Sequence, residues 1–198
     1  MYLLREVHHR VKNNLQVMLS LLNLEASRAS SPDVTRIVRV LQDRLRAVAL
    51  VHDQLHRAPA LREVDLRAYA AAVLEGIGVS NGLDRRGIAV RLRGSRGVIG
   101  MNDALRVGLV LNELVSNAAA HGFPDRRRGQ ILVSVSLRAR TRVCVKVSNT
   151  GVPLPARFSP PPDRLGLAIV GNIARHSGGR FWWSRRNGTS FHVELKQS

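Results

Sequence analysis

The sequence predicts a two-part protein, a pair of antiparallel helices followed by an α/β sandwich with a mixed, mainly antiparallel sheet. Three observations predict it. Residues 3–55 carry apolar side chains every three or four positions, which is the period of one helix face. From Asp65 onward, helical segments alternate with short segments in which polar and apolar residues alternate, as in half-buried strands. Gly- and Pro-containing stretches separate these segments.

A chain of 198 residues with 44% hydrophobic content can hold one large domain or two small ones. The repeat of apolar residues changes after Pro59. We therefore expect a helical hairpin over residues 1–60 and a sandwich domain over residues 61–198.

The first helix is expected from about Leu3 to Arg28. Ser31 can cap a second helix that has Pro32 at its first position. The second helix carries its own apolar stripe, made of Val34, Ile37, Leu41, Leu45, Val48, Val51 and Leu55. A lone hairpin cannot bury two such stripes, so we expect it to pair with a second copy into a dimeric four-helix bundle.

In the second part, Asp65 can cap a short helix that ends at about Leu74. The glycines and asparagine that follow predict a loop, and they are Gly76, Gly78, Asn81 and Gly82. The later segments are a strand at 88–92, a long helix at 102–120, strands at 131–137 and 142–148, a Pro-rich loop at 153–162, a helix at 165–176 and a final hairpin of strands at 180–184 and 190–195.

The formal net charge is +17, from 31 Lys and Arg against 14 Asp and Glu. The arginines are spread along the chain. A compositional bias of the genome explains this distribution as well as binding to a nucleic acid does. We expect no specific nucleic-acid partner, and a basic nucleic-acid-binding module stays as an alternative. Cys144 is the only cysteine, and its apolar neighbours predict a buried thiol. We find neither a signal peptide nor a membrane-spanning segment, and we expect a cytoplasmic protein.

Polar side chains interrupt the apolar face of the long helix. Glu113 and Asn117 are four residues apart and lie on the same face. Hard oxygen ligands of this kind suit a divalent cation or a phosphate chain, although two polar residues can also simply bridge to neighbours. Downstream, Gly151 follows a strand, Gly166 opens a helix that could receive phosphate, and Gly188 turns into the last strand.

The N-terminal stretch Glu6–Gln16 sets two adjacent histidines inside an amphipathic helix. His8 and His9 lie about 100° apart on the helical wheel, so at most one points fully inward while the other meets water. Taken alone, this stretch could be an ordinary polar helix face.

Together these segments resemble the bacterial sensor histidine kinases with a GHKL-type ATP-binding domain, over essentially the whole chain. The run His8–Asn14, HHRVKNN, reproduces the H-box of the HWE-like subgroup, and His9 matches its phosphoacceptor. Asn112–His121 matches the N-box, with Asn117 in the Mg²⁺-binding place. The positions that the resemblance assigns to nucleotide binding are Asn112, Asn117, His121, Asn149, Gly151, Gly166, Leu167, Gly188 and Thr189.

The resemblance implies a dimeric hairpin followed by a GHKL (Bergerat-type) sandwich that uses ATP and Mg²⁺. ATP would phosphorylate His9, with Glu6 and Glu113 as candidates to orient the ring or take the proton. The phosphoryl group would then pass to an aspartate of a response regulator receiver domain. The signal would come from a sensory domain or a separate sensor protein.

Three positions depart from the family pattern. Asn149 stands where most relatives have an aspartate that accepts a hydrogen bond from adenine, Pro153 replaces a glycine, and Ala120 replaces a lysine. These departures keep open a phosphotransferase or scaffold with a degenerate nucleotide site. A GHKL ATPase that only hydrolyses ATP is a further alternative, but it has no use for the H-box.

Overall fold

The structure, a computed structural model, describes residues 63–95, 97–124, 128–139, 141–159, 165–185 and 188–198, together with scattered residues between 15 and 49. Apart from Ser31, the described residues between 15 and 49 are helical. The H-box, including Glu6 and His9, lies outside the described residues, and so does the predicted turn of the hairpin apart from Ser31.

The described part of the N-terminal segment exposes a set of large apolar side chains. These are 40–58% exposed, and they are Val17, Met18, Leu21, Leu24, Val34, Ile37 and Leu41. Leu15 and Val38 are buried in the same segment. An apolar surface of this kind on helices usually marks a contact with another chain.

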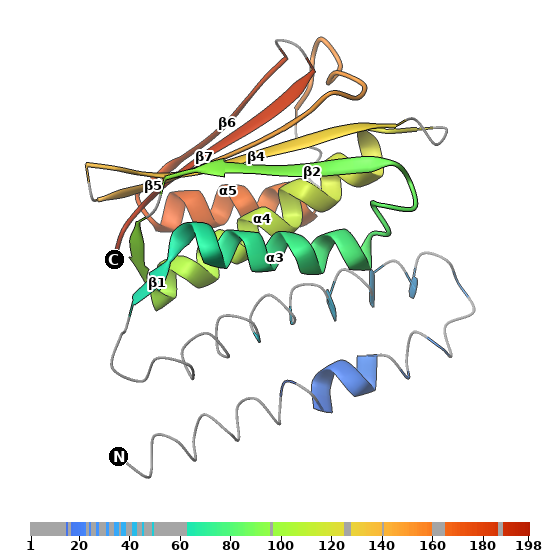
Figure 1. The fold of residues 1–198 in the computed structure, drawn as a ribbon, viewed down its shortest axis with the longest axis horizontal. Helices are drawn as coiled ribbons and strands as arrows, with labels where there is room; N and C mark the ends of the chain where they lie inside the picture. The colour runs from blue at the N-terminus through green and yellow to red at the C-terminus, as the bar shows by residue number, and fades with distance from the viewer. Residues whose placement is uncertain are drawn as a thin grey trace.

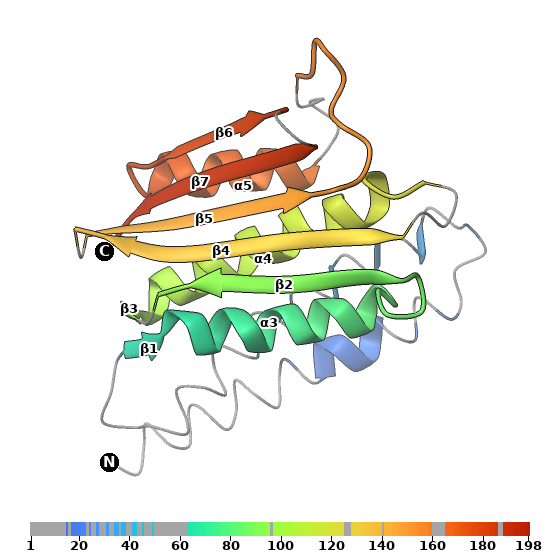
Figure 2. The ribbon, with the colours of Figure 1, turned by 45° about the horizontal axis from the view of Figure 1, so that its top comes forward.

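A five-stranded sheet forms one layer of the second part. It contains, side by side in this order, β2 (Ile88–Gly94), β4 (Gly129–Arg138), β5 (Arg142–Asn149), β7 (Thr189–Lys196) and β6 (Arg180–Ser184) (Figure 2). Strands β2 and β4 are parallel, and the other neighbouring pairs are antiparallel. The prediction of a mixed, mainly antiparallel sheet is therefore confirmed.

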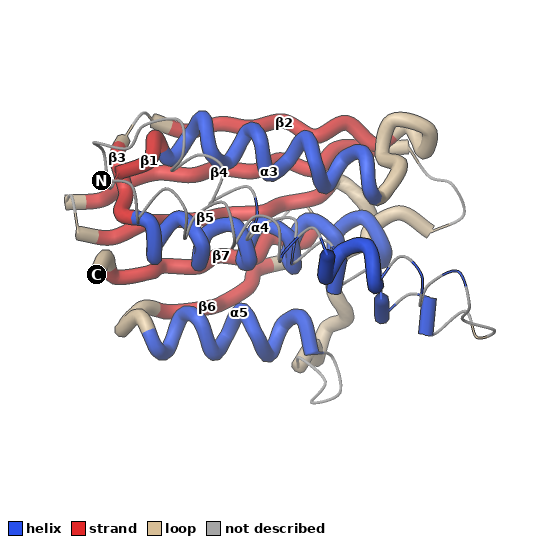
Figure 3. The backbone as a smooth tube through the Cα atoms, turned by 90° about the horizontal axis from the view of Figure 1, so that it is seen from below, coloured by secondary structure: helices blue, strands red, loops and turns tan. Residues whose placement is uncertain are grey.

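Three helices cover one face of this sheet (Figures 1 and 3). They are α3 (Leu66–Ser80), α4 (Met101–His121) and α5 (Leu165–His176). A small antiparallel pair, β1 (Glu63–Asp65) with β3 (Val98–Gly100), precedes α3 and α4 and was not predicted. Among the described helices, none has the length and hydrophobicity that crossing a membrane requires.

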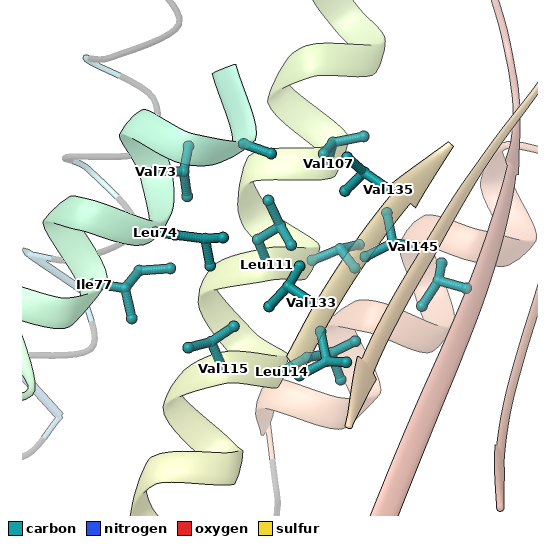
Figure 4. Close-up of a cluster of buried hydrophobic side chains, with 14 of the residues drawn as sticks. Val73, Leu74, Ile77, Val107, Leu111, Leu114, Val115, Val133, Val135 and Val145 are labelled. Carbon is teal, nitrogen blue, oxygen red and sulfur yellow. The ribbon is translucent and has the colours of Figure 1, made fainter. Parts of the chain in front are cut away.

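The core lies between α4 and its neighbours on both sides (Figure 4). One face of α4 is fully buried through Val107, Leu111 and Leu114. This face packs against α3 and against the inward-facing valines of β4 and β5, among them Val133 and Val145. Because burial of each large aliphatic side chain contributes about 1.5–3 kcal/mol, this layer holds α4 firmly in place.

Helix α3 begins as predicted and ends later than predicted. The Asp65 carboxylate accepts a hydrogen bond from the backbone N–H of Ala68 at 2.7 Å, which confirms the N-cap. The helix continues to Ser80, so the prediction of a loop at Gly76 and Gly78 is wrong. Burial of Ile77 one turn beyond Val73 outweighs the cost of two helical glycines, about 1 kcal/mol each.

Gly108 lies in the middle of α4 because a larger residue would not fit beside α3. A Cβ at Gly108 would collide with the hydroxyl of Tyr69. That hydroxyl is buried and has no hydrogen-bond partner in the described part of the chain, and burial raises the pKa of Tyr69 well above its ordinary value. The phenol is therefore neutral, and α3 and α4 approach closely at this point.

Cys144 lies on the side of the sheet opposite the helices. The inward positions of β5 are Val143, Val145 and Val147, so the residue between the first two of these valines points outward. Cys144 is partly exposed, and the prediction of a buried thiol is wrong. Its apolar neighbours in sequence lie on the other face of the strand.

Candidate functional site

The residues predicted to bind nucleotide from α4 onward lie in four elements that meet at one end of the sheet. These are the C-terminal half of α4, the end of β5, the first turn of α5 and the start of β7. The structure thus brings together positions that are more than 70 residues apart in the sequence. It does so through three contacts, each of which involves a glycine.

The first contact joins α4 to the first turn of α5. A Cβ at Gly166 would collide with Oε2 of Glu113 and would lie 3.8 Å from Nδ2 of Asn117. Glu113 is only 6% exposed, so its carboxylate cannot easily move aside. The α5 backbone therefore lies directly on Glu113 and Asn117, which share one face of α4 as their spacing predicts.

Asn117 carries a buried donor that no described residue satisfies. Its Nδ2 atom has no hydrogen-bond partner among the described residues. A buried amide left in this state costs about 1–3 kcal/mol, and native proteins keep few of them. An anionic oxygen from a ligand between α4 and α5 would satisfy this donor, which makes Asn117 fit a phosphate.

The second contact joins the end of β5 to the end of α4. Asn149, the last residue of β5, is 6% exposed, and its Oδ1 accepts a hydrogen bond from the N–H of Gly151 at 3.0 Å. A Cβ at Gly151 would collide with the carbonyl oxygen of Gly122, which itself accepts from Val152 N–H at 2.8 Å. The glycine turn after β5 is thus fixed against the C-cap of α4.

The third contact holds the start of β7 beside Asn149. Gly188 has φ +102, and a Cβ there would collide with the backbone carbonyl of Asn149. Thr189 is paired with Asn149 in the sheet, and its Oγ1 accepts from Leu154 N–H at 3.1 Å. Thr189 therefore ties the loop that follows Gly151 to the last strand.

Gly188→Ala is expected to lower the free energy of unfolding by about 2–4 kcal/mol, because it adds both strain at positive φ and a backbone collision. Urea denaturation followed by circular dichroism measures this change. The matched control is Gly76→Ala in α3, where an added Cβ meets nothing within 4 Å. That control is expected to raise the free energy of unfolding by about 0.5–1 kcal/mol. Equal effects of the two changes would contradict the role given to Gly188.

The other predicted residues differ in position. Asn112 is buried in α4, at 3% exposure, and His121 is the exposed last residue of that helix. The Leu167 side chain packs into the hydrophobic core. Glu6 and His9 lie outside the described residues, so the structure does not place them relative to this site.

One residue of the site was not predicted. It is Gly122, the C-cap of α4, where a Cβ would lie 3.1 Å from Oδ1 of Asn149 and 2.6 Å from the carbonyl oxygen of Ala118. The signal available in the sequence was the short spacing between Asn117 and Gly122. No set of three or more His, Cys, Asp or Glu side chains in the described ranges could hold a metal ion.

The fold and the site define a nucleotide-binding sandwich domain preceded by a helical segment. Residues 6–80 match a family model described as histidine kinase. Residues 102–198 match the histidine kinase-, DNA gyrase B- and HSP90-like ATPases. The chain belongs to the histidine kinases, and it carries the core of a sensor histidine kinase with a GHKL-type ATPase domain.

Named relatives agree with this assignment. The chain is 36% identical over 169 residues to the sensor histidine kinase PdtaS of Mycolicibacterium smegmatis, covering 84% of this chain and 33% of the relative. It is 30% identical over 203 residues to the blue-light-activated histidine kinase 2 of Erythrobacter litoralis, covering 98% of this chain and 57% of the relative. The chain thus spans from a third to just over half of these relatives.

Solved structures show the same fold. The histidine kinase domain of the EL346 blue-light activated histidine kinase of Erythrobacter litoralis superimposes with a TM-score of 0.72 at 26% identity, over 98% of this chain and 90% of that domain. Histidine kinase ThkA in complex with the response regulator protein TrrA gives a TM-score of 0.52 at 20% identity, over 100% of this chain and 61% of that chain.

Proposed function

We propose that this chain is the catalytic core of a two-component sensor histidine kinase. It uses ATP to phosphorylate His9 and then passes the phosphoryl group to an aspartate of a response regulator. The observation that carries the proposal is the unsatisfied buried amide of Asn117 beside Gly166 and Glu113, in a domain of an ATPase family. A histidine kinase segment that contains His9 precedes this domain.

The residues of the site suit the parts of ATP. Asn117 would donate to a phosphate oxygen through Nδ2, and its Oδ1 would hold Mg²⁺. When bound, Mg²⁺ would neutralise charge on the phosphate chain. The N-terminal turn of α5 receives the phosphates, and Asn149 accepts from the adenine amino group with its second lone pair.

The other nucleotide contacts follow the same elements. Gly151 and Gly188 keep the backbone close to the base. Thr189 holds the loop after Gly151 through its hydrogen bond from Leu154 N–H. Asn112, His121 and the backbone at Leu167 complete the binding surface at its edges.

The chemical step is an in-line transfer. A ring nitrogen of His9 attacks the γ-phosphorus, the N–P bond forms, and the bond from phosphorus to the bridging oxygen breaks with its electron pair leaving on ADP. With an unperturbed pKa near 6.5, roughly three quarters of such an imidazole is neutral at pH 7. The ring therefore needs orientation more than a strong base. Glu6 would orient it, and Glu113 is the second candidate for handling the ring proton.

The protein is proposed to work as a homodimer through residues 1–60, with the ATP-binding domain at 61–198. The exposed apolar side chains of the helical segment support this, among them Met18, Leu21 and Ile37. The response regulator is proposed to dock on the helical bundle, and ThkA, which shares the fold, has been solved with such a partner. We place the protein in the cytoplasm, with input from a sensory domain or a separate sensor protein.

A second function is a histidine phosphotransferase or scaffold whose nucleotide site has decayed. It is favoured by Asn149, Pro153 and Ala120, which replace a carboxylate, a glycine and a lysine of the family pattern. Incubation with radiolabelled ATP separates the two functions. The kinase gives a protein label that acid removes and alkali does not. Absence of both this label and nucleotide binding in calorimetry rules out the kinase.

Asn149→Asp is expected to tighten ATP binding by about three- to tenfold, because a hydrogen bond to a charged acceptor is worth more than one to a neutral acceptor. The carboxylate can also keep the bond from Gly151 N–H. Calorimetric titration with ATP measures the change, and Asn172→Asp on the exposed face of α5 is the control for added charge. Unchanged or weaker binding in Asn149→Asp would place the adenine elsewhere.

A further inference from the structure

We propose that the open face of the five-stranded sheet, opposite the helices, docks an acidic polypeptide segment of a partner protein. Seven exposed cationic side chains point outward from this face. They come from all five strands, and they are Arg91, Arg93, Arg138, Arg142, Lys146, Arg180 and Lys196. We call this surface the cationic sheet face.

The charge is specific to this face and does not simply reflect the basic composition. The only carboxylate among its outward-facing residues is Glu194, so its formal net charge is +6. The three helices on the other face carry three Arg and three acidic residues between them, a net charge of zero with His neutral. Distributed arginines alone would not produce this difference between two sides of one domain.

The middle of the cationic sheet face is hollowed. A concavity of about 340 Å³ lies across β4, β5, β7 and β6. Its wall and floor carry hydroxyl groups, a cation and an aromatic ring, including those of Ser134, Ser136, Lys146 and Trp182. These groups offer hydrogen-bond donors for carboxylate and backbone oxygens of a chain that crosses the strands.

Glu194 pairs with three arginines of this face and accepts hydrogen bonds from Arg180 without using up its donors. Its carboxylate lies 2.9 Å from Arg180, 3.8 Å from Arg142 and 3.9 Å from Arg138. The carboxylate is 9% exposed, whereas the arginine side chains are 71%, 46% and 72% exposed. Each guanidinium has five N–H donors, so each keeps free donors for a carboxylate from outside.

The chemistry favours an acidic polypeptide over a single-stranded nucleic acid. Sheets that bind single strands use exposed aromatic rings on which bases stack. On this face the Trp182 ring is already stacked on His192, with centroids 5.1 Å apart, and Arg180 lies over it at 5.4 Å. The remaining aromatic side chains of β6 and β7, Phe181, Trp183 and Phe191, alternate to the helix side.

The size of the face favours a segment over a whole domain. Five strands of five to ten residues span roughly 20 Å by 25 Å at ordinary strand spacing. The area is therefore below the approximately 800 Å² that each partner buries in a standard protein interface. A short extended segment rich in Asp and Glu fits this area and its charge.

The test uses the full chain and a short fluorescent peptide of alternating Asp and Glu. In the face variant, Arg91, Arg93 and Lys146 are each changed to Gln, which leaves the Glu194 cluster intact. The matched control changes Arg67, Arg85 and Arg175 to Gln, so that the same net charge is lost from exposed positions off this face. Thermal melts confirm that both variants fold.

The face variant is expected to bind the peptide about tenfold more weakly than the unchanged chain, and the control by less than about twofold. The bound peptide is also expected to slow alkylation of Cys144, the only cysteine, which lines the concavity. This alkylation is run at alkaline pH because burial raises the pKa of the thiol. Single-stranded DNA and vesicles of anionic lipid serve as competing probes.

Equal weakening in the two variants would overturn the proposal, because net charge alone would then explain the binding. Unprotected Cys144 in the presence of saturating peptide would overturn it as well. The DNA or the vesicles could bind more strongly than the peptide, and this binding could be lost in the face variant. That result would overturn the proposal and assign the face to nucleic acid or membrane instead. None of these outcomes depends on phosphorylation of His9.

Discussion

Replacing His9 with glutamine is expected to abolish the acid-labile phosphoryl label. A carboxamide keeps the polarity and much of the size of the side chain, but its nitrogen lone pair is delocalised and does not attack phosphorus. The label is measured after incubation with γ-labelled ATP, followed by electrophoresis under alkaline and acidic conditions. We expect nucleotide binding to stay unchanged, since no predicted nucleotide contact involves His9.

His8→Gln is the matched control, because it makes the same change at the neighbouring position. About 100° separates the two side chains on a helix, so only one of them can meet the phosphate. We expect His8→Gln to keep most of the label, with any loss due to packing. A label that survives in His9→Gln and disappears in His8→Gln would move the phosphoacceptor to His8.

Asn117→Ala is expected to lower autophosphorylation by at least about 100-fold, the range seen when one contact to a developing charge is removed from an active site. ATP affinity is expected to fall as well, because both the phosphate donor and the metal ligand are lost. Initial rates of labelling at saturating ATP, together with calorimetry, separate the two effects.

The stability of the Asn117→Ala variant makes this prediction sharper. The substitution removes a buried donor that has no partner among the residues that the structure describes, so the free energy of unfolding without nucleotide should stay the same or rise. Lost activity in a more stable protein then points to the ligand and not to unfolding. Asn172→Ala, the same change on the exposed side of α5, is the control and should keep full activity. Wild-type activity of Asn117→Ala would leave its amide without a role.

Elements with strong local signals could be predicted closely. The helix at Leu165–His176 and the strand at Arg180–Ser184 lie where the sequence places them, since glycines bound the helix and bulky aromatics mark the strand. The long helix differs by one residue at each end, because Gly100 and Gly122 limit it. The patterns there are local, and no distant contact competes with them.

Features that depend on distant contacts could not be predicted. Strands β1 and β3 are three residues long, which is too short to show a recognisable alternation of polar and apolar residues. The extension of α3 through Gly76 follows from its packing on α4. In the site, the order of Asn117, Gly151 and Gly188 could be predicted from the family pattern. The contacts of Gly122 with Asn149 and of Thr189 with Leu154 require the folded chain.

The position of β7 has a consequence for how the domain is assembled during translation. This strand is the last of the sheet in sequence, but it lies between β5 and β6 and forms Asn149–Thr189 pairing at the site. Until the ribosome has released Thr189–Lys196, β5 and β6 have no shared neighbour, and both present open edges. A nascent kinase therefore cannot bind its nucleotide early, and the interval before β7 inserts is when the chain most needs protection from aggregation.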